Sequence, residues 1–108
     1  MLRQTMDPSE KKRRVKAWRE GERAKARAAF PLAVEQLRDL FDSVGTAVDE
    51  QGCDESLRFT MRWLTDHALD PASVVPWLQE NGGWCDCEVV ANAEQAAAEA
   101  LGNPDGWH

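Results

Sequence analysis

The sequence predicts an all-α protein: a compact bundle of four to five short helices preceded by a long, basic N-terminal helix. Three observations carry this prediction. Apolar residues recur at spacings of three and four along most of the chain. Residues 8–29 consist almost entirely of Lys, Arg, Glu and Ala, which are good helix formers. Asp-Pro, a helix-start signal, occurs at Asp7 and again at Asp70.

The first helix is predicted to begin with Asp7 as its N-cap and Pro8 in its first position, and to continue to Phe30. Pro31 then breaks or restarts the helix. Val15 and Trp18 are three residues apart and share a face, but the apolar stripe is thin. We therefore expect a largely exposed helix that docks through Trp18 and its C-terminal end.

The next two helices are predicted to form the core. The stretch LAVEQLRDLFDSVGTAVDEQG is the clearest amphipathic segment, and Gly52 is a good stop for it. In CDESLRFTMRWLTDHAL, Asp54 or Ser56 is positioned to cap the following helix. Two apolar faces indicate that this helix is central; the first contains Leu57, Met61, Leu64 and Ala68, and the second contains Phe59 and Trp63.

The fourth helix is predicted to begin at Asp70 and Pro71 and to end at Gly82 and Gly83, with either a kink or a later start at Pro76. The last helix is predicted from about residue 87, with Asp86 as its N-cap. A short strand at 87–91 is the main alternative, because CEVV has strand character when taken alone.

The charge distribution divides the chain. Residues 1–29 contain ten of the 13 basic and four of the 19 acidic residues, a net charge of +6, whereas the remainder carries −12. We therefore expect a basic helical arm at 1–29, a helical core domain at 30–102 and a flexible tail at 103–108. The arm is either a solvated helix or a contact surface, through residues 8–29, for a partner protein, RNA or the ribosome.

Composition also predicts the compartment. No run of about 18 apolar residues is present, so we expect no membrane span, and the N-terminus lacks the apolar region of a secretory signal. Three cysteines are an odd number, which favours free thiols or metal ligands over disulfides. We expect a cytoplasmic protein.

The stretch GGWCDCEVVAN, residues 82–92, is the main candidate site. Cys85 and Cys87 can reach one ion from a turn that precedes a helix, and Cys53 also lies just before a predicted helix start. Zinc takes four Cys, His or carboxylate ligands, so these three thiolates can form a site. The fourth ligand would be a water molecule or one of His67, Glu55, Asp86 and Glu88.

Two other interpretations remain open. A thiol-based enzyme or redox protein would use Cys85 or Cys87, although C-x-C is not the thioredoxin-like spacing and neighbouring acids disfavour thiolates. Alternatively, the motif is a structural corner in which the cysteines pack as small hydrophobic residues. We assign no catalytic residue and interpret the chain as a small binding or adaptor protein, with zinc as the one cofactor that the residues suggest.

GCDESLRFT and GGWCDCEVVAN together resemble a family of small uncharacterised bacterial proteins that carry GCD-x-[ST]-x-R-x-T and GG-aromatic-CDCEV-x-x-N motifs. The resemblance covers residues 19–94 and implies no activity. It places this family's motif positions on Cys53, Asp54, Arg58, Cys85, Asp86, Cys87, Glu88 and Asn92. Two departures are implied: Trp84 stands where tyrosine is usual, and Glu55 where histidine is common, which would alter a site that uses the histidine.

Overall fold

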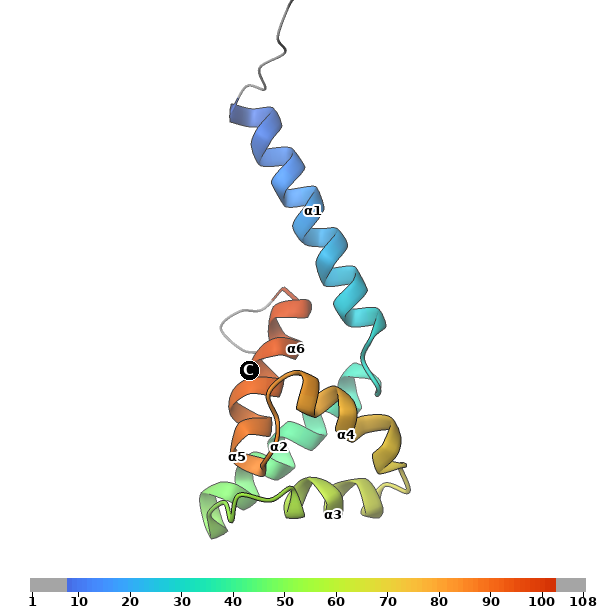
Figure 1. Cartoon of the computed structure of the whole chain (residues 1–108), viewed down its shortest axis with the longest axis vertical. Helices are drawn as coiled ribbons and strands as arrows, with labels where there is room; N and C mark the ends of the chain where they lie inside the picture. Colours follow the sequence, from blue (N-terminus) through green and yellow to red (C-terminus); the bar gives the residue numbers. More distant parts are fainter. Residues whose placement is uncertain (1–7, 103–108) are drawn as a thin grey trace, which may run out of the picture.

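A computed structural model describes residues 8–102 as a set of helices joined by short loops (Figure 1). The first four helices are α1 (Pro8–Ala28), α2 (Val34–Gln51), α3 (Arg58–Asp66) and α4 (Pro71–Glu80). The last helical run is continuous and consists of α5 (Asp86–Glu88), the π-helix η1 (Val89–Ala93) and α6 (Glu94–Ala100). This part of the chain contains no strand, so the all-α prediction is confirmed and the alternative strand at 87–91 is wrong. The predicted N-cap Asp7 and the predicted tail at 103–108 lie outside the described residues.

Helix α1 extends away from the other helices and touches them mainly at its C-terminal end (Figure 1). There Arg27 Nη1 donates a 2.8 Å hydrogen bond to the Ala100 carbonyl at the end of α6. The molecule measures 66 × 25 × 21 Å, and its radius of gyration is 17.9 Å. A compact domain of this length has a radius of gyration of about 13 Å, so the projecting helix accounts for an elongated shape.

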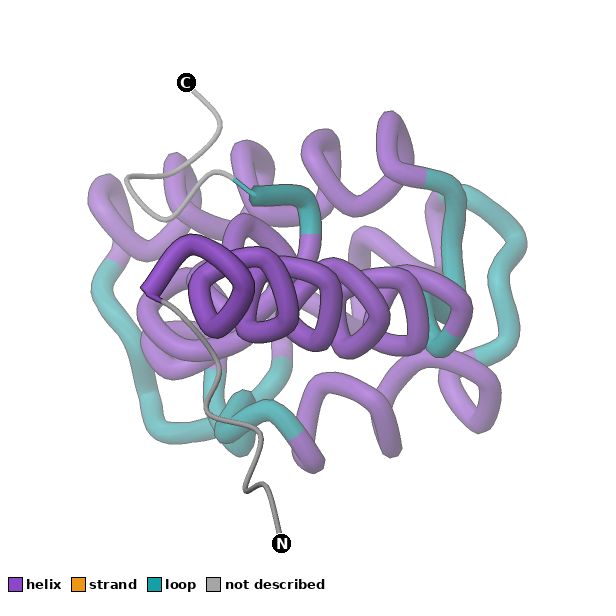
Figure 2. Tube along the Cα trace, turned by 90° about the horizontal axis from the view of Figure 1, so that it is seen from above, coloured by secondary structure: helices purple, strands orange, loops and turns teal. Residues whose placement is uncertain are grey.

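The core lies between α2, α3, α4 and the last helical run, and Figure 2 shows α1 in front of these elements when the molecule is seen from above. The amphipathic pattern of α2 predicts its buried face, since Leu37, Leu40, Phe41 and Val44 are at most 1% exposed. On the last run the buried apolar positions are Val89, Ala93, Ala97, Ala98 and Ala100. Small alanines allow this helix to approach its neighbours closely.

Of the two apolar faces predicted for helix α3, the one with Phe59 and Trp63 is buried, whereas the other is buried only at Leu64. Met61 is 39% exposed and Ala68 is also exposed. The buried residues are Phe59, Thr60, Trp63 and Leu64. Burial of the polar residue Thr60 within this face is the unexpected feature. Its hydroxyl donates a hydrogen bond to Asp86 in the CDCE segment, residues 85–88, which forms the cysteine corner together with the Cys53 loop.

Helix α4 begins as predicted, because the Asp70 side chain accepts a 3.0 Å hydrogen bond from the Ala72 N–H. It continues through Pro76 without restarting, so the later start, one of the two alternatives considered at Pro76, is wrong. Gly82, with φ of 83°, takes the left-handed conformation that ends the helix. The Gly83 N–H then donates a 2.7 Å bond to the Leu78 carbonyl, which satisfies one acceptor of the last turn.

None of the described helices is both long enough and apolar enough to cross a membrane.

Candidate functional site at the cysteine corner

The carboxylate of Asp86 lies at the centre of the corner and is fully buried. It accepts hydrogen bonds from the Phe59 N–H (3.0 Å), the Thr60 N–H (3.0 Å) and the Thr60 hydroxyl (2.7 Å). These two N–H groups belong to the first turn of α3, where four donors lack partners within the helix. The prediction that Asp86 caps its own helix is therefore wrong: Cys85 occupies that position, and Asp86 caps α3 from across the fold.

The loop before α3 in turn supplies hydrogen-bond acceptors to the start of the last helical run. The Asp86 N–H donates a 2.9 Å hydrogen bond to the Ser56 carbonyl. The Cys53 sulfur accepts hydrogen bonds from the Cys87 backbone N–H and, at 3.4 Å, from the Glu55 N–H. Each helix start is thus capped by groups from the other segment, which fixes the Cys53 loop against the CDCE corner.

Neither predicted local cap of α3 occupies the N-cap position, which is taken by Leu57. Asp54 instead accepts hydrogen bonds from the Ser56 hydroxyl and, at 3.1 Å, from the Ser56 N–H, which shapes the loop. Ser56 does contribute at the helix start, because its hydroxyl oxygen accepts a 3.3 Å bond from the Arg58 N–H. The loop is therefore held locally by Asp54 and across the fold by Asp86.

Arg58 closes the outer side of the same loop. Its Nε lies 3.5 Å from an Asp54 oxygen, and its Nη2 donates a 3.2 Å hydrogen bond to the Gly52 carbonyl. The guanidinium also lies over the Phe59 ring, 4.4 Å from the ring centroid. Of the two pairings considered for Arg58, with Asp54 or with the acids of the CDCE segment, the structure contains the one with Asp54.

The turn before the corner is held by Asn92, whose Nδ2 donates a 3.0 Å hydrogen bond to the Gly82 carbonyl. Asn92 lies within η1, and π-helical turns are rare and often occur at functional positions. Glu88 turns back to accept a 3.3 Å bond from the Trp84 N–H. Gly83 leaves no room for a side chain, because a Cβ there would lie 3.0 Å from the Leu78 carbonyl oxygen.

All three cysteines line one surface hollow of about 510 Å³, together with Glu55, Trp84 and Glu88. The thiols are free; Cys53 and Cys85 are half-buried and Cys87 is exposed. Trp84 is 62% exposed at this hollow. The structure therefore brings together the three thiols predicted to share a site, although Cys53 comes from a different segment of the chain.

The three thiols have different acidities because they interact with one another. Hydrogen bonds from the backbone N–H and thiol of Cys87, together with the Glu55 N–H, lower the pKa of Cys53. Donation of its proton toward Cys53 raises the pKa of Cys87 to about 11. Burial raises the pKa of the Cys85 thiol. Of the three thiols, Cys53 is therefore the first to ionise.

His67 lies away from this hollow, at the opposite end of α3 from the Cys53 loop (Figure 1). Its Nδ1 is 2.8 Å from the Trp63 carbonyl, its Nε2 is 3.4 Å from Asp39, and its ring stacks on Trp63. The structure thus gives both ring nitrogens other partners and does not bring His67 to the cysteines. Among residues 8–102, no three His, Cys, Asp or Glu side chains stand in an arrangement that could hold a metal ion.

Thr60 is the corner residue that sequence reasoning missed, and Ser56 was considered only as a helix cap. Thr60 presents its hydroxyl and N–H to Asp86, and Ser56 contributes its backbone carbonyl. A polar β-branched residue between apolar positions of a core helix was the available signal for Thr60. The Ser56 carbonyl carries no sequence signal, because every residue has one.

The fold and the corner define a small all-α protein in which two helix starts cap each other around a trio of thiols. Residues 40–92 match the family described as "Protein of unknown function (DUF2695)". An uncharacterized protein of Mycobacterium tuberculosis, Rv2271, is 36% identical over 95 residues, covering 86% of this chain and 96% of the relative. Mb2294 of Mycobacterium bovis, also uncharacterized, matches to the same extent.

The chain belongs to this family, which confirms the predicted resemblance to small uncharacterised bacterial proteins. The matched range, residues 40–92, includes the Cys53 loop and the CDCE corner but not α1. No solved structure matches the fold.

Proposed function

We propose that the protein is a small metal-binding module whose thiol hollow takes a thiophilic divalent ion, with zinc as the first candidate. The observation that carries the proposal is the convergence of Cys53, Cys85 and Cys87 in one surface hollow. Two segments of the chain are held together there by the buried Asp86 carboxylate. Thiolate sulfur is the ligand that structural zinc sites use most.

Glu55 supplies the fourth ligand in this proposal. It lines the same hollow as the thiols, and carboxylate oxygen is an accepted zinc ligand. Its backbone has φ of 67°, in the left-handed region that few residues other than glycine adopt. Glu88 is the other carboxylate in the hollow, but it already accepts the Trp84 N–H.

Metal binding requires the side chains to rearrange. The thiols now hydrogen-bond to one another, and within the described chain they do not stand as a ready-made ligand set. An ion would displace the thiol protons, so affinity should rise with pH. Four protein ligands would make the site structural.

Elemental analysis of protein purified without added metal tests the proposal, together with zinc uptake by the fully reduced protein. We expect about one equivalent of zinc in the wild type, and cobalt substitution should give thiolate charge-transfer absorption. Cys53→Ser, Cys85→Ser and Cys87→Ser should each lose the ion. His67→Ala is the control and should retain it. Less than about 0.1 equivalents, with no uptake by the reduced protein, would contradict the proposal.

A disulfide between Cys53 and Cys87 is a second candidate, favoured by the hydrogen bonds between these two residues. The Cys53 thiolate would attack a low-molecular-weight disulfide and release one thiol. The Cys87 thiolate would then attack the mixed disulfide and release the second thiol. Peptide mapping after equilibration with oxidised glutathione should show a Cys53–Cys87 crosslink that dithiothreitol removes. Fully reduced protein, or only mixed disulfides, under an oxidising buffer would exclude this role.

A further inference from the structure

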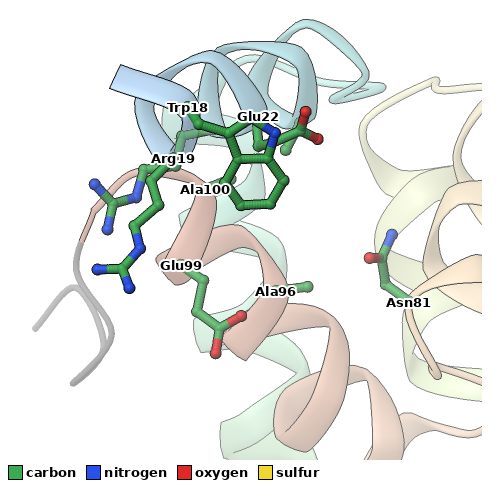
Figure 3. Close-up of a pocket in the computed structure, with 9 residues that line it drawn as sticks. Trp18, Arg19, Glu22, Asn81, Ala96, Glu99 and Ala100 are labelled. Carbon is green, nitrogen blue, oxygen red and sulfur yellow. The ribbon is translucent and has the colours of Figure 1, made fainter. Parts of the chain in front are cut away.

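Helix α1 carries a second surface that the cysteine corner does not use. Its outer face has a hollow of about 560 Å³, lined by Lys11, Lys12, Val15, Lys16, Arg19 and Arg23. An adjoining hollow of about 510 Å³ lies between α1 and α6 and shares Arg19 and Arg23 with the first. Trp18 lines this second hollow and is 67% exposed (Figure 3). A row of cations thus runs beside an exposed indole.

Most of these cations are available to an external anion. The acids of α1 pair within the helix: Glu10 lies 3.8 Å from Arg14, Glu20 lies 2.7 Å from Arg23, and Glu22 lies 3.4 Å from Lys25. In the described part of the chain, Lys11, Lys12, Lys16 and Arg19 form none of the ion pairs. A tryptophan exposed this far is unusual, because burial of its ring is strongly favourable.

The acidic core lies too far from Lys11, Lys12 and Lys16, at the N-terminal end of this row, to neutralise them. Arg27 marks where α1 meets α6, and Lys11 is sixteen residues before it. At 1.5 Å per residue this is about 24 Å, well beyond the Debye length of about 8 Å at physiological salt. The hollow between α1 and α6 does contain Glu22 and Glu99, and Asn81 faces it from the far side (Figure 3). An anionic ligand is therefore favoured on the outer face and at Trp18, and not deeper against α6.

We propose that α1 binds single-stranded nucleic acid, with phosphates along the row from Lys11 to Arg19 and one unpaired base stacked on Trp18. Proteins that bind single strands combine a basic groove with aromatic rings on which bases stack. An unbroken duplex offers phosphates but no free base face, so the indole favours a single strand. The proposal is independent of the thiol site, and the cysteine variants should bind nucleic acid as the wild type does.

Fluorescence anisotropy with a labelled twelve-nucleotide oligouridine tests the proposal on the full-length protein. A matched single-stranded DNA distinguishes RNA from DNA as the source, and a blunt duplex tests the need for an unpaired base. Affinity for the single strands should fall steeply between 50 and 200 mM salt, because binding releases counterions. The duplex should bind about 10-fold more weakly. No binding of either single strand at about 100 µM protein and 50 mM salt would overturn the proposal.

Three variants locate the contact. Trp18→Ala should weaken binding about 10-fold with little change in salt dependence, and Trp18→Phe should restore most of the affinity. Lys12→Ala/Lys16→Ala should weaken binding and make the salt slope shallower by about 1.4. Arg14→Ala/Lys25→Ala removes the same charge from paired positions outside both hollows and should change affinity less than about 3-fold.

Two results would assign this face differently. If both double variants lost affinity equally and Trp18→Ala bound as the wild type does, binding would depend only on the net charge of α1. Concentration-dependent dimerisation that Trp18→Ala abolishes, without nucleic-acid binding, would assign the face to a second copy of the chain. Circular dichroism should show unchanged helix content in each variant, because all the altered side chains are exposed.

Discussion

The arm and the corner hold their charged groups in opposite ways. On α1 the acids and bases are largely exposed, and those that pair do so with neighbours three or four residues away, as in the Arg23 and Glu20 pair. At the corner, Asp86 is buried and its partners lie 26 and 27 residues away. Exposed pairs contribute roughly 0–1 kcal/mol, whereas a buried carboxylate without partners is very costly. Substitutions of charged residues on the arm should therefore change stability little, whereas substitution of Asp86 at the corner should destabilise the fold.

Asp86→Ala should cause the largest loss of stability in either region. The change leaves two buried N–H groups and the Thr60 hydroxyl without an acceptor, each costing about 1–3 kcal/mol. We expect the free energy of unfolding to fall by about 3–5 kcal/mol, measured by urea denaturation. Thr60→Val removes one donor of the three and should cost about 1 kcal/mol.

Asp42→Ala is the matched control for Asp86, because Asp42 is exposed on α2. It should change stability by less than about 0.5 kcal/mol. An Asp86→Ala protein as stable as this control would show that the two helix starts do not depend on each other.

The arm is shaped by local interactions and the corner by interactions across the fold. Local features can be predicted from the sequence more readily. Propensity and periodicity act over a few residues, so the start of α1 at Pro8, the buried stripe of α2 and the Asp70 cap were predictable. Capping across the fold depends on tertiary packing. An aspartate before a helix looks like a local cap whichever helix it serves, and the prediction for Asp86 failed for this reason.

The grouping of the three cysteines was predicted only conditionally, because it required the Cys53 loop to meet the CDCE segment. The hydrogen bond from the Asp86 N–H to the Ser56 carbonyl holds the two segments together, and it involves backbone groups that every residue possesses. His67 shows the opposite case. Residue type alone suggested a metal ligand, but Trp63 and Asp39 give the ring a packing role.

Gly83 at the corner and Gly21 on the arm should respond in opposite ways to replacement by alanine. At Gly83 a Cβ would lie 3.0 Å from the Leu78 carbonyl oxygen and 3.1 Å from a Val89 methyl group, so Gly83→Ala should cost about 1–3 kcal/mol. At Gly21, in the middle of α1, a Cβ meets nothing within 4 Å. Gly21→Ala should instead increase α1 helicity and stability by about 0.5–1 kcal/mol. Thermal unfolding followed by circular dichroism measures both, and a gain at Gly83 would refute the close packing of the corner.

The thiols themselves should react at different rates in the reduced, metal-free protein. The pKa of Cys87 is raised to about 11, whereas that of Cys53 is lowered from 9.0. At pH 8 the thiolate of Cys53 should then be much more populated than that of Cys87, and its lower intrinsic nucleophilicity only partly offsets this advantage. Peptide mapping after brief iodoacetamide treatment should find Cys53 labelled first. Labelling of Cys87 first, or at an equal rate, would contradict the hydrogen bond that links them.

The smallest effect is expected on the arm. Glu20→Ala removes the closest ion pair of α1, at 2.7 Å, but both side chains are well exposed, at 38% and 54%. Because water and salt already screen such a pair, the free energy of unfolding should change by less than about 0.5 kcal/mol, and less still in 1 M salt. The same change frees Arg23, which lines both hollows of α1. Glu20→Ala should therefore tighten nucleic-acid binding while leaving the unfolding curve unchanged. No variant of the buried corner is expected to combine these two results.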